Sequence, residues 1–121
     1  MGKKSASRFT DLVVWQKAHE YVLSVYRLTS EFPREEIYGL TSQLRRAAVS
    51  VAANIAEGFK KTSAAEKVRY LNISQGSLEE CRYYTILAKD LAYLSADVSE
   101  SQIDSVAKLL TAYANAIRRN R

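Results

Sequence analysis

Residues 37–58 read Ile-Tyr-Gly-Leu-Thr-Ser-Gln-Leu-Arg-Arg-Ala-Ala-Val-Ser-Val-Ala-Ala-Asn-Ile-Ala-Glu-Gly, and this stretch decides the fold. One stripe recurs in it at alternating spacings of three and four: Ile37, Leu40, Leu44, Ala47, Val51, Asn54 and Gly58. That spacing places side chains on one face of an α-helix and is typical of bundles. Small residues allow a neighbouring helix to approach closely: Ala47, Ala48, Ala52 and Ala53. We therefore expect a packed helix from about Glu35 or Glu36 to Gly58.

A segment with helical spacing precedes this one, from about Asp11 to Glu31. The hydroxyl of Thr10 can cap its first turn, and Asp11 suits the positive end of a helix. Pro33 disfavours helical conformation in the residue before it, so we expect a turn there. Trp15 is expected in the core, next to a stripe formed by Val14, Ala18, Tyr21, Val22, Val25, Leu28 and Phe32.

Two more helices are predicted after the central stretch. The first begins with Ser63–Glu66, a capping box whose two side chains can each bond a free N–H, and runs to about Leu91. The second begins with Ser99–Gln102, which has the same pattern, and reaches Ile117. Gly76 costs about 1 kcal/mol relative to alanine inside a helix, so it indicates a close helix crossing or a bend.

Short connections between consecutive helices make each pair antiparallel. The sequence therefore predicts an all-α fold, an antiparallel up-down-up-down four-helix bundle. We expect a basic N-terminal tail over residues 1–9, the bundle domain over residues 10–118 and a basic C-terminal tail over residues 119–121. The scarcity of helix breakers, four glycines and one proline in 121 residues, favours such long helices.

The net charge of +5 comes from the two ends of the sequence. Six of the 18 basic residues lie there: Lys3, Lys4, Arg8, Arg118, Arg119 and Arg121. The remainder holds 12 basic and 13 acidic residues, so the sequence alone gives no reason to expect a broad basic face on the bundle.

The residues that several classes of function require are absent from the sequence. Cys81 is the only cysteine and His19 the only histidine, which leaves no disulfide, no catalytic triad and no Glu-x-x-His metal motif. There is no glycine-rich phosphate loop. We expect no catalytic residue, metal, cofactor or small-molecule substrate. No run of about 18 apolar residues and no signal-peptide core occurs, so we expect a cytoplasmic protein without a membrane partner.

A polar side is predicted on each of the two central helices. The second helix carries Gln43, Arg46, Ser50, Asn54 and Glu57, and the third carries Ser74, Ser77, Glu80 and Tyr84. If these sides face each other, they form either a ligand pocket or a hydrogen-bond network that fixes helix register. We favour the network and expect Arg46 to pair with Glu80 or Glu57.

Basic residues gather around the turn between these helices: Lys60, Lys61, Lys67 and Arg69. They are either solvated or in contact with phosphate, since the helix that begins at Ser63 also attracts anions at its N-terminus. The C-terminal arginines, Arg118, Arg119 and Arg121, raise the same alternatives.

Three stretches together resemble a known family: residues 9–18, residues 36–58 and residues 76–80, which read Gly-Ser-Leu-Glu-Glu. The chain resembles, from about Phe9 to Leu94, the S23 or 23S rRNA intervening-sequence proteins. Distant relatives are the accessory variability determinants of diversity-generating retroelements. The resemblance implies a bacterial four-helix bundle that forms a ring, commonly a pentamer, with genes inside ribosomal RNA gene insertions. It implies no catalytic residue.

The first two helices carry apolar residues on two sides, and only one side can close the bundle. We therefore expect a homo-oligomer. We also expect either Tyr83 or Tyr84 to be exposed or at a subunit interface, because adjacent helical residues point about 100° apart.

The expected function is non-enzymatic association with RNA or DNA through the tails and the turn at Lys60. The alternative is a protein–protein scaffold or adaptor, including a retroelement accessory protein, that binds no nucleic acid.

Overall fold

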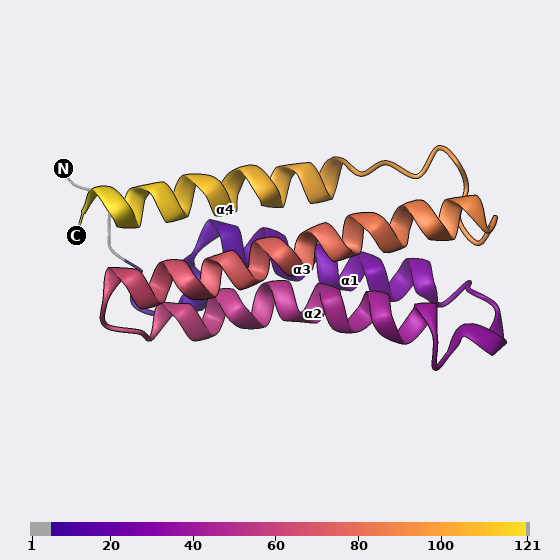
Figure 1. Ribbon diagram of the computed structural model, residues 1–121, viewed down its shortest axis with the longest axis horizontal. Helices are drawn as coiled ribbons and strands as arrows, with labels where there is room; N and C mark the ends of the chain where they lie inside the picture. Colours follow the sequence, from indigo (N-terminus) through magenta and orange to yellow (C-terminus); the bar gives the residue numbers. More distant parts are fainter. Residues whose placement is uncertain (1–5, 121) are drawn as a thin grey trace.

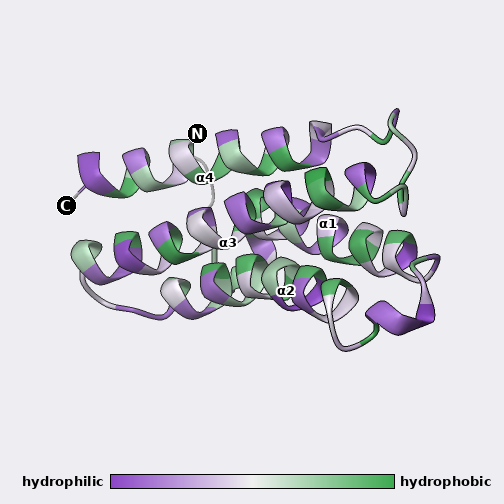
Figure 2. Cartoon of the chain, turned by 45° about the vertical axis from the view of Figure 1, so that its right-hand side comes forward, coloured by the Kyte–Doolittle hydropathy of each residue, from purple (hydrophilic) through white to green (hydrophobic). Residues whose placement is uncertain are grey.

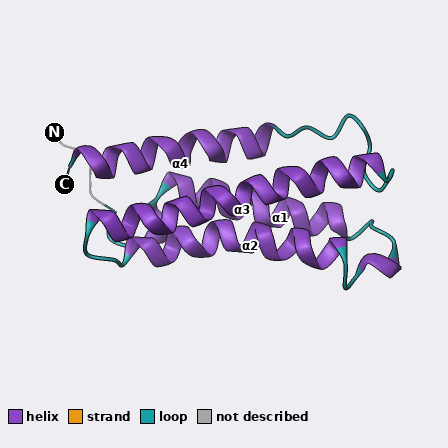
Figure 3. Cartoon of the chain, in the orientation of Figure 1, coloured by secondary structure: helices purple, strands orange, loops and turns teal. Residues whose placement is uncertain are grey.

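Four helices form an antiparallel bundle in the computed structural model, which describes residues 6–120 (Figures 1 and 3). The helices are α1 (Val13–Thr29), α2 (Leu40–Phe59), α3 (Ala64–Asp90) and α4 (Ser101–Arg119). Two 3-10 turns precede α1 and α2, at Phe9–Asp11 and Arg34–Glu36. Residues 6–120 contain no β-strand. The predicted all-α four-helix bundle is confirmed.

The helices close into a ring of neighbours, in which α2 and α3 share the largest contact and α1 also touches α4. Apolar and polar patches lie along the helices (Figure 2), and each helix turns one side to the core. On α3 that side includes the hydroxyl residues Ser74, Ser77 and Thr85. The most deeply buried side chains come from all four helices and include Val25, Leu44, Val51, Ile55, Leu71, Leu78, Cys81, Ile103 and Leu110. The stripes at spacings of three and four thus supply the core.

The start of α2 differs from the prediction. Residues 34–36 form a 3-10 turn, and the α-helix begins only at Leu40, with Gly39 as its N-cap. The carboxylate of Glu36 accepts a hydrogen bond from the Leu40 backbone N–H at 3.0 Å. A side chain at Gly39 would collide with this carboxylate, because its Cβ would lie 2.6 Å from Glu36 Oε1. Glu36 therefore caps α2 from the preceding turn.

The capping of α1 was also predicted wrongly. Thr10 lies inside the first 3-10 turn, and the N-cap of α1 is Leu12, whose side chain forms no capping bond. Asp11 instead accepts hydrogen bonds from the backbone N–H groups of Ser7 and Arg8, at 3.0 and 3.2 Å. The acidic side chain fixes the segment before the helix rather than the helix itself.

The two predicted capping boxes have different outcomes. Ser63 caps α3 as expected, with Oγ accepting from the Glu66 N–H at 3.1 Å. The second box is wrong, because α4 begins at Ser101 and its N-cap is Glu100. Ser99 Oγ accepts from the Ser101 N–H at 3.0 Å and so belongs to the linker before the helix.

Of the two alternatives predicted for Gly76, a close helix crossing is excluded within residues 6–120. A Cβ at this position would meet nothing within 4 Å. The close approach occurs at Gly58, where a Cβ would lie 2.9 Å from the Cβ of Tyr70 on α3. Gly58 therefore sets the spacing of α2 and α3 near the turn that joins them.

The end of α3 is formed by a residue in the left-handed conformation. Ala92 has a φ of 63°, and the N–H groups of Tyr93 and Leu94 both bond the carbonyl of Ala88, at 2.8 and 3.3 Å. This closure resembles the motif that usually places glycine after a helix. It directs the chain into the linker that precedes α4.

An arginine links α3 to α4. Arg82 bonds Glu79 at 3.0 Å, Glu100 at 3.2 Å and Asp104 at 2.9 Å, and Lys89 adds a contact to Glu100 at 3.7 Å. With 28% of its side chain exposed, Arg82 lies at the edge of the bundle. Its bonds to Glu100 and Asp104 hold the start of α4 against α3.

Candidate nucleic-acid interface

One end of the bundle gathers most of the basic residues singled out in the sequence. The start of α1, the α2–α3 turn and the end of α4 all lie at this end (Figure 1). We call it the basic end and define it by its described cationic residues, Arg8, Lys60, Lys61, Lys67, Arg69, Arg118 and Arg119. Three acidic residues lie in the same segments: Asp11, Glu57 and Glu66. Arg121 lies outside the described residues.

Lys67 is engaged by the backbone. Its Nζ donates to the carbonyl oxygen of Phe59 at 2.7 Å and lies 5.4 Å from the Phe59 ring centroid. Carbonyl groups in the last turn of a helix lack partners within the helix, and a cation is favourable there. Lys67 therefore fastens the end of α2 to the start of α3 and contributes less to a surface charge than the sequence indicates.

Arg69 is paired within its own helix. Its guanidinium bonds both carboxylate oxygens of Glu66, at 3.0 and 3.3 Å. These hydrogen bonds hold the pKa of Glu66 below its ordinary value. The charge of Arg69 is thus largely balanced by a neighbour one turn away.

The remaining basic side chains of the basic end are available for contact with phosphate. In the portion of the chain that the structure describes, no acidic side chain pairs with Lys60, Lys61, Arg118 or Arg119. Lys60, Arg118 and Arg119 are exposed. Arg118 donates only to the side-chain oxygen of Asn115, at 3.1 Å. These four cations are the strongest candidates for phosphate contact.

An aromatic ring lies among them. The Tyr70 ring centroid is 5.0 Å from Lys61 Nζ and 4.7 Å from Arg69 Cζ. Sequence reasoning missed Tyr70, although the order of aromatic and basic residues on either side of the turn is visible in the sequence. The basic end therefore combines charge with an aromatic surface.

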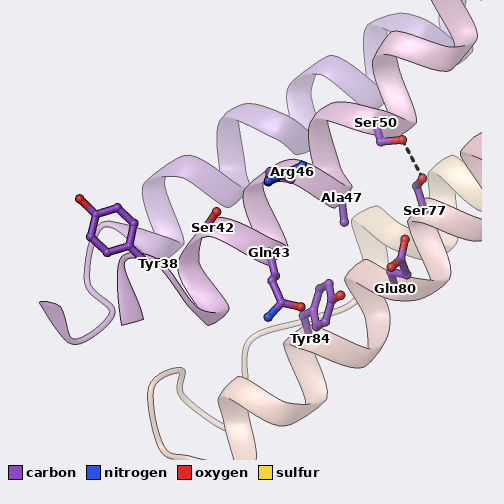
Figure 4. Close-up of a pocket in the computed structure, with 9 residues that line it drawn as sticks. All are labelled: Tyr38, Ser42, Gln43, Arg46, Ala47, Ser50, Ser77, Glu80 and Tyr84. Carbon is purple, nitrogen blue, oxygen red and sulfur yellow. Dashed lines mark hydrogen bonds between the residues drawn. The ribbon is translucent and has the colours of Figure 1, made fainter. Parts of the chain in front are cut away.

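The predicted polar sides of α2 and α3 do face each other. They line an open groove of about 350 Å³, formed by Tyr38, Ser42, Gln43, Arg46, Ala47, Ser50, Ser77, Glu80 and Tyr84 (Figure 4). Ser50 and Ser77 are joined by a hydrogen bond of 2.8 Å between their hydroxyls. Asn54 donates to the carbonyl and to the hydroxyl of Ser50, at 2.8 and 3.0 Å. Burial, followed by the nearby Glu80 carboxylate, raises the pKa of Tyr84.

The expected ion pair of Arg46 is not formed. Within residues 6–120, Arg46 makes no ion pair or hydrogen bond with Glu57 or Glu80, and all three side chains are exposed. Gln43 is exposed as well. The hydrogen bonds between α2 and α3 come instead from small residues. One of them is Ser74, which is buried and donates to the Val51 carbonyl at 2.8 Å. Short hydroxyl side chains, rather than charges, fix the register of α2 and α3.

A second groove, between α1 and α2, is apolar. It measures about 360 Å³ and is lined by Phe9, Trp15, His19, Val22, Val49, Ala52, Ala53 and Ala56. Trp15 is only half-buried at its edge, stacked on His19 with ring centroids 5.0 Å apart and in edge contact with Phe9 at 5.1 Å. The expectation of a core Trp15 was therefore wrong. Tyr83 is exposed and Tyr84 half-buried, as their adjacency predicted.

Comparison with known proteins agrees with this architecture. The family model of the 23S rRNA-intervening sequence proteins matches residues 10–112. The chain belongs to the 23S rRNA-intervening sequence protein family. A solved structure of an S23 ribosomal protein family member of unknown function, from Bacteroides thetaiotaomicron VPI-5482, is 25% identical and aligns with a TM-score of 0.77. The alignment covers 85% of this chain and 96% of that one.

Family membership confirms the resemblance carried by residues 9–18, 36–58 and 76–80. No functionally curated protein shows significant similarity to the chain. The 23S rRNA-intervening sequence protein family is not a known enzyme family. Among residues 6–120, no cluster of three or more histidine, cysteine or acidic side chains could hold a metal ion. None of the described helices combines the length and the apolar character that crossing a membrane needs.

Proposed function

We propose that this 23S rRNA-intervening sequence family member is a non-enzymatic homo-oligomeric protein that binds RNA or another nucleic acid through its basic end. The observation that carries the proposal is the convergence of separate basic segments at one end of the bundle (Figure 1). Lysine and arginine side chains on a convex end contact backbone phosphates and carry no sequence information. The binding is therefore expected to be strong at low salt and weakly selective for sequence.

The opposite end of the bundle has the opposite charge balance. The α1–α2 and α3–α4 connections lie there, with three cations, Arg27, Arg34 and Lys89, near six acidic residues, Glu31, Glu35, Glu36, Asp90, Asp97 and Glu100 (Figure 1). A nucleic acid repels this end and attracts the basic end, which orients the bundle during the encounter. This polarity follows from the placement of the charges and not from the net charge.

Self-association supplies the rest of the affinity. The groove of Trp15 and Val49 is apolar and open, and other large apolar side chains are exposed along the bundle, including Leu23, Tyr26 and Tyr83. Patches of this kind mark protein interfaces. In a ring, such as the pentamer implied by the resemblance, several basic ends act together, and multivalency can raise avidity by about 10²–10⁴.

The test compares two variants with equal loss of charge. In the first, Lys60, Lys61, Arg118 and Arg119 are replaced by glutamine. In the control, glutamine replaces four exposed cations elsewhere, Lys17, Arg27, Arg34 and Lys108. Fluorescence anisotropy with labelled RNA should show weaker binding, by at least about tenfold, and a shallower salt dependence only for the first variant. Equal weakening in both would reduce the effect to net charge, and no binding at low salt would remove the proposal.

The alternative function is a protein–protein scaffold, and the apolar α1–α2 groove favours it. A single aspartate at Val49 separates the two roles, because it places a charge in the groove and leaves the basic end unchanged. Under the scaffold function, sedimentation would show loss of assembly and RNA would not bind either protein. Under our proposal, the same variant loses assembly and keeps weak binding by a single subunit.

A further inference from the structure

Tyr70 is an aromatic residue whose position the hydrophobic core does not explain. It is half-buried, and it belongs neither to the core nor to the partly buried apolar residues packed against the core. Two cations flank its ring, Lys61 at 5.0 Å and Arg69 at 4.7 Å. Both cations lie over the ring, so a flat ligand can stack there in two ways: on the ring itself, where Lys61 moves aside, or on the Arg69 guanidinium.

The local structure holds this ring in place. Gly58 leaves the room that the Tyr70 side chain occupies, since a Cβ at Gly58 would lie 2.9 Å from Tyr70 Cβ. Arg69 is fixed by its two bonds to Glu66, and Lys67 is fixed by the Phe59 carbonyl. The ring and its neighbours are therefore positioned before any ligand arrives, which lowers the entropy lost on binding.

We infer that Tyr70 is a stacking platform for an unpaired nucleobase, and that the basic end recognises single-stranded nucleic acid in preference to a continuous duplex. The inference rests on the proposed function and names its substrate class. Bases inside a duplex stack on each other and offer no free face, whereas an unpaired base can stack on an aromatic ring or a guanidinium plane. Lys60 and Lys61, which precede α3, supply the phosphate contacts on either side of such a base.

Stacking and charge predict separable effects on binding. Stacking on one aromatic side chain contributes about 1–3 kcal/mol per base and tolerates any base. Loss of the ring should therefore weaken single-strand binding by about 5–150-fold. The dependence on salt should not change, because no phosphate contact is lost.

The experiment uses the full chain and three probes: an unstructured single-stranded RNA of about 20 nucleotides, a duplex RNA of equal length and inorganic polyphosphate. The variants are Tyr70→Leu, Tyr70→Phe and the control Tyr38→Leu, which changes an exposed tyrosine in the turn before α2, at the opposite end of the bundle. Circular dichroism during heating checks that each variant folds. We expect Tyr70→Leu alone to lose affinity for the single strand, with Tyr70→Phe and Tyr38→Leu unchanged.

The outcomes separate this inference from the proposed function. Equal binding of single strand and duplex overturns the inference, as does an unchanged affinity of Tyr70→Leu for the single strand. The same loss of affinity for polyphosphate overturns it too, because that probe has no bases. If the four-residue glutamine variant keeps full affinity, the proposed function fails. If that variant loses affinity while Tyr70→Leu does not, only the stacking platform is rejected.

Discussion

The hydroxyl of Tyr93 donates a hydrogen bond to Glu36 Oε2 at 2.9 Å, which joins the linker after α3 to the turn before α2. The second oxygen of the same carboxylate accepts from the Leu40 N–H at 3.0 Å. One side chain therefore caps a helix and connects two loops that are 57 residues apart.

This relationship predicts a pH-dependent stability. The Leu40 N–H, followed by the Tyr93 hydroxyl, lowers the pKa of Glu36. A carboxylate with a lowered folded-state pKa stabilises the fold above its unfolded pKa, near about 4.3, and loses that contribution as pH falls through the folded value. Urea unfolding should show Glu36→Gln less stable than the parent at pH 7, and the difference should shrink as the pH falls below about 4.3. Glu35→Gln, at the exposed neighbouring position, is the control and should show no such convergence.

Ala92 predicts a stabilising substitution. Its φ of 63° lies in the left-handed region, where a side chain is unfavourable and glycine is not. Ala92→Gly should raise the free energy of unfolding by about 0.5–1 kcal/mol, measured by urea titration. Ala96→Gly, in the same linker but without a positive φ, should be neutral or slightly destabilising. A gain at Ala96 equal to that at Ala92 would contradict this account.

Replacing each of the two helical glycines by alanine should change the free energy of unfolding in opposite directions. At Gly76 a Cβ meets nothing, so Gly76→Ala should stabilise the folded subunit by about 1 kcal/mol through helix propensity. At Gly58 a Cβ would lie 2.9 Å from Tyr70 Cβ, so Gly58→Ala should destabilise by about 1–3 kcal/mol. Thermal unfolding of both variants checks the pair. A loss of stability at Gly76 would mean that something outside this chain covers the position.

Arg82 should be the most sensitive surface charge. Arg82→Met removes contacts to Glu79, Glu100 and Asp104 and should cost about 1 kcal/mol, because the pairs are partly solvated. The cost should shrink at about 1 M salt, where screening acts within about 3 Å. The comparison is Arg27→Met, an exposed arginine that within residues 6–120 donates to Ser24 alone. Equal losses in the two variants, measured by urea unfolding, would rule out the network as the cause.

The thiol of Cys81 should be unreactive in the native protein. Burial raises the pKa of the thiol to about 12, so almost no thiolate forms near neutral pH. Labelling with a thiol-reactive disulfide reagent should be slower by orders of magnitude in native protein than in urea. Rapid labelling under native conditions would show that α1 and α3 separate readily around this residue.

The fold could be predicted because burial is periodic. Val14, Leu44, Leu78 and Leu110 belong to stripes that repeat every three or four residues, and the structure buries all four. The residues at which helices begin were harder to predict. Glu36 caps α2 from a preceding turn, and it is itself held by Tyr93, which is distant in sequence. Local propensity contains no information about such a partner.

The candidate site could be predicted only in part, because it too depends on contacts between residues that are distant in sequence. The basic residues near Lys60 and Arg118 are visible in the sequence, and antiparallel topology brings them to one end. Their availability depends on contacts: Lys67 is held by a carbonyl of α2, and Arg69 by Glu66. The pair of Arg69 with Glu66 could have been found from the three-residue spacing. The Phe59 carbonyl that holds Lys67 depends on how the turn folds.

The antiparallel arrangement has a practical consequence for labelling. The start of α1 and the end of α4 lie at the basic end, so a purification tag or fluorophore placed directly before α1 or directly after α4 lies beside the surface that we assign to RNA (Figure 1). A polyhistidine tag there would add its own affinity for phosphate. The exposed linker between α3 and α4, around Ala96, lies at the far end and is the better place for a reporter peptide.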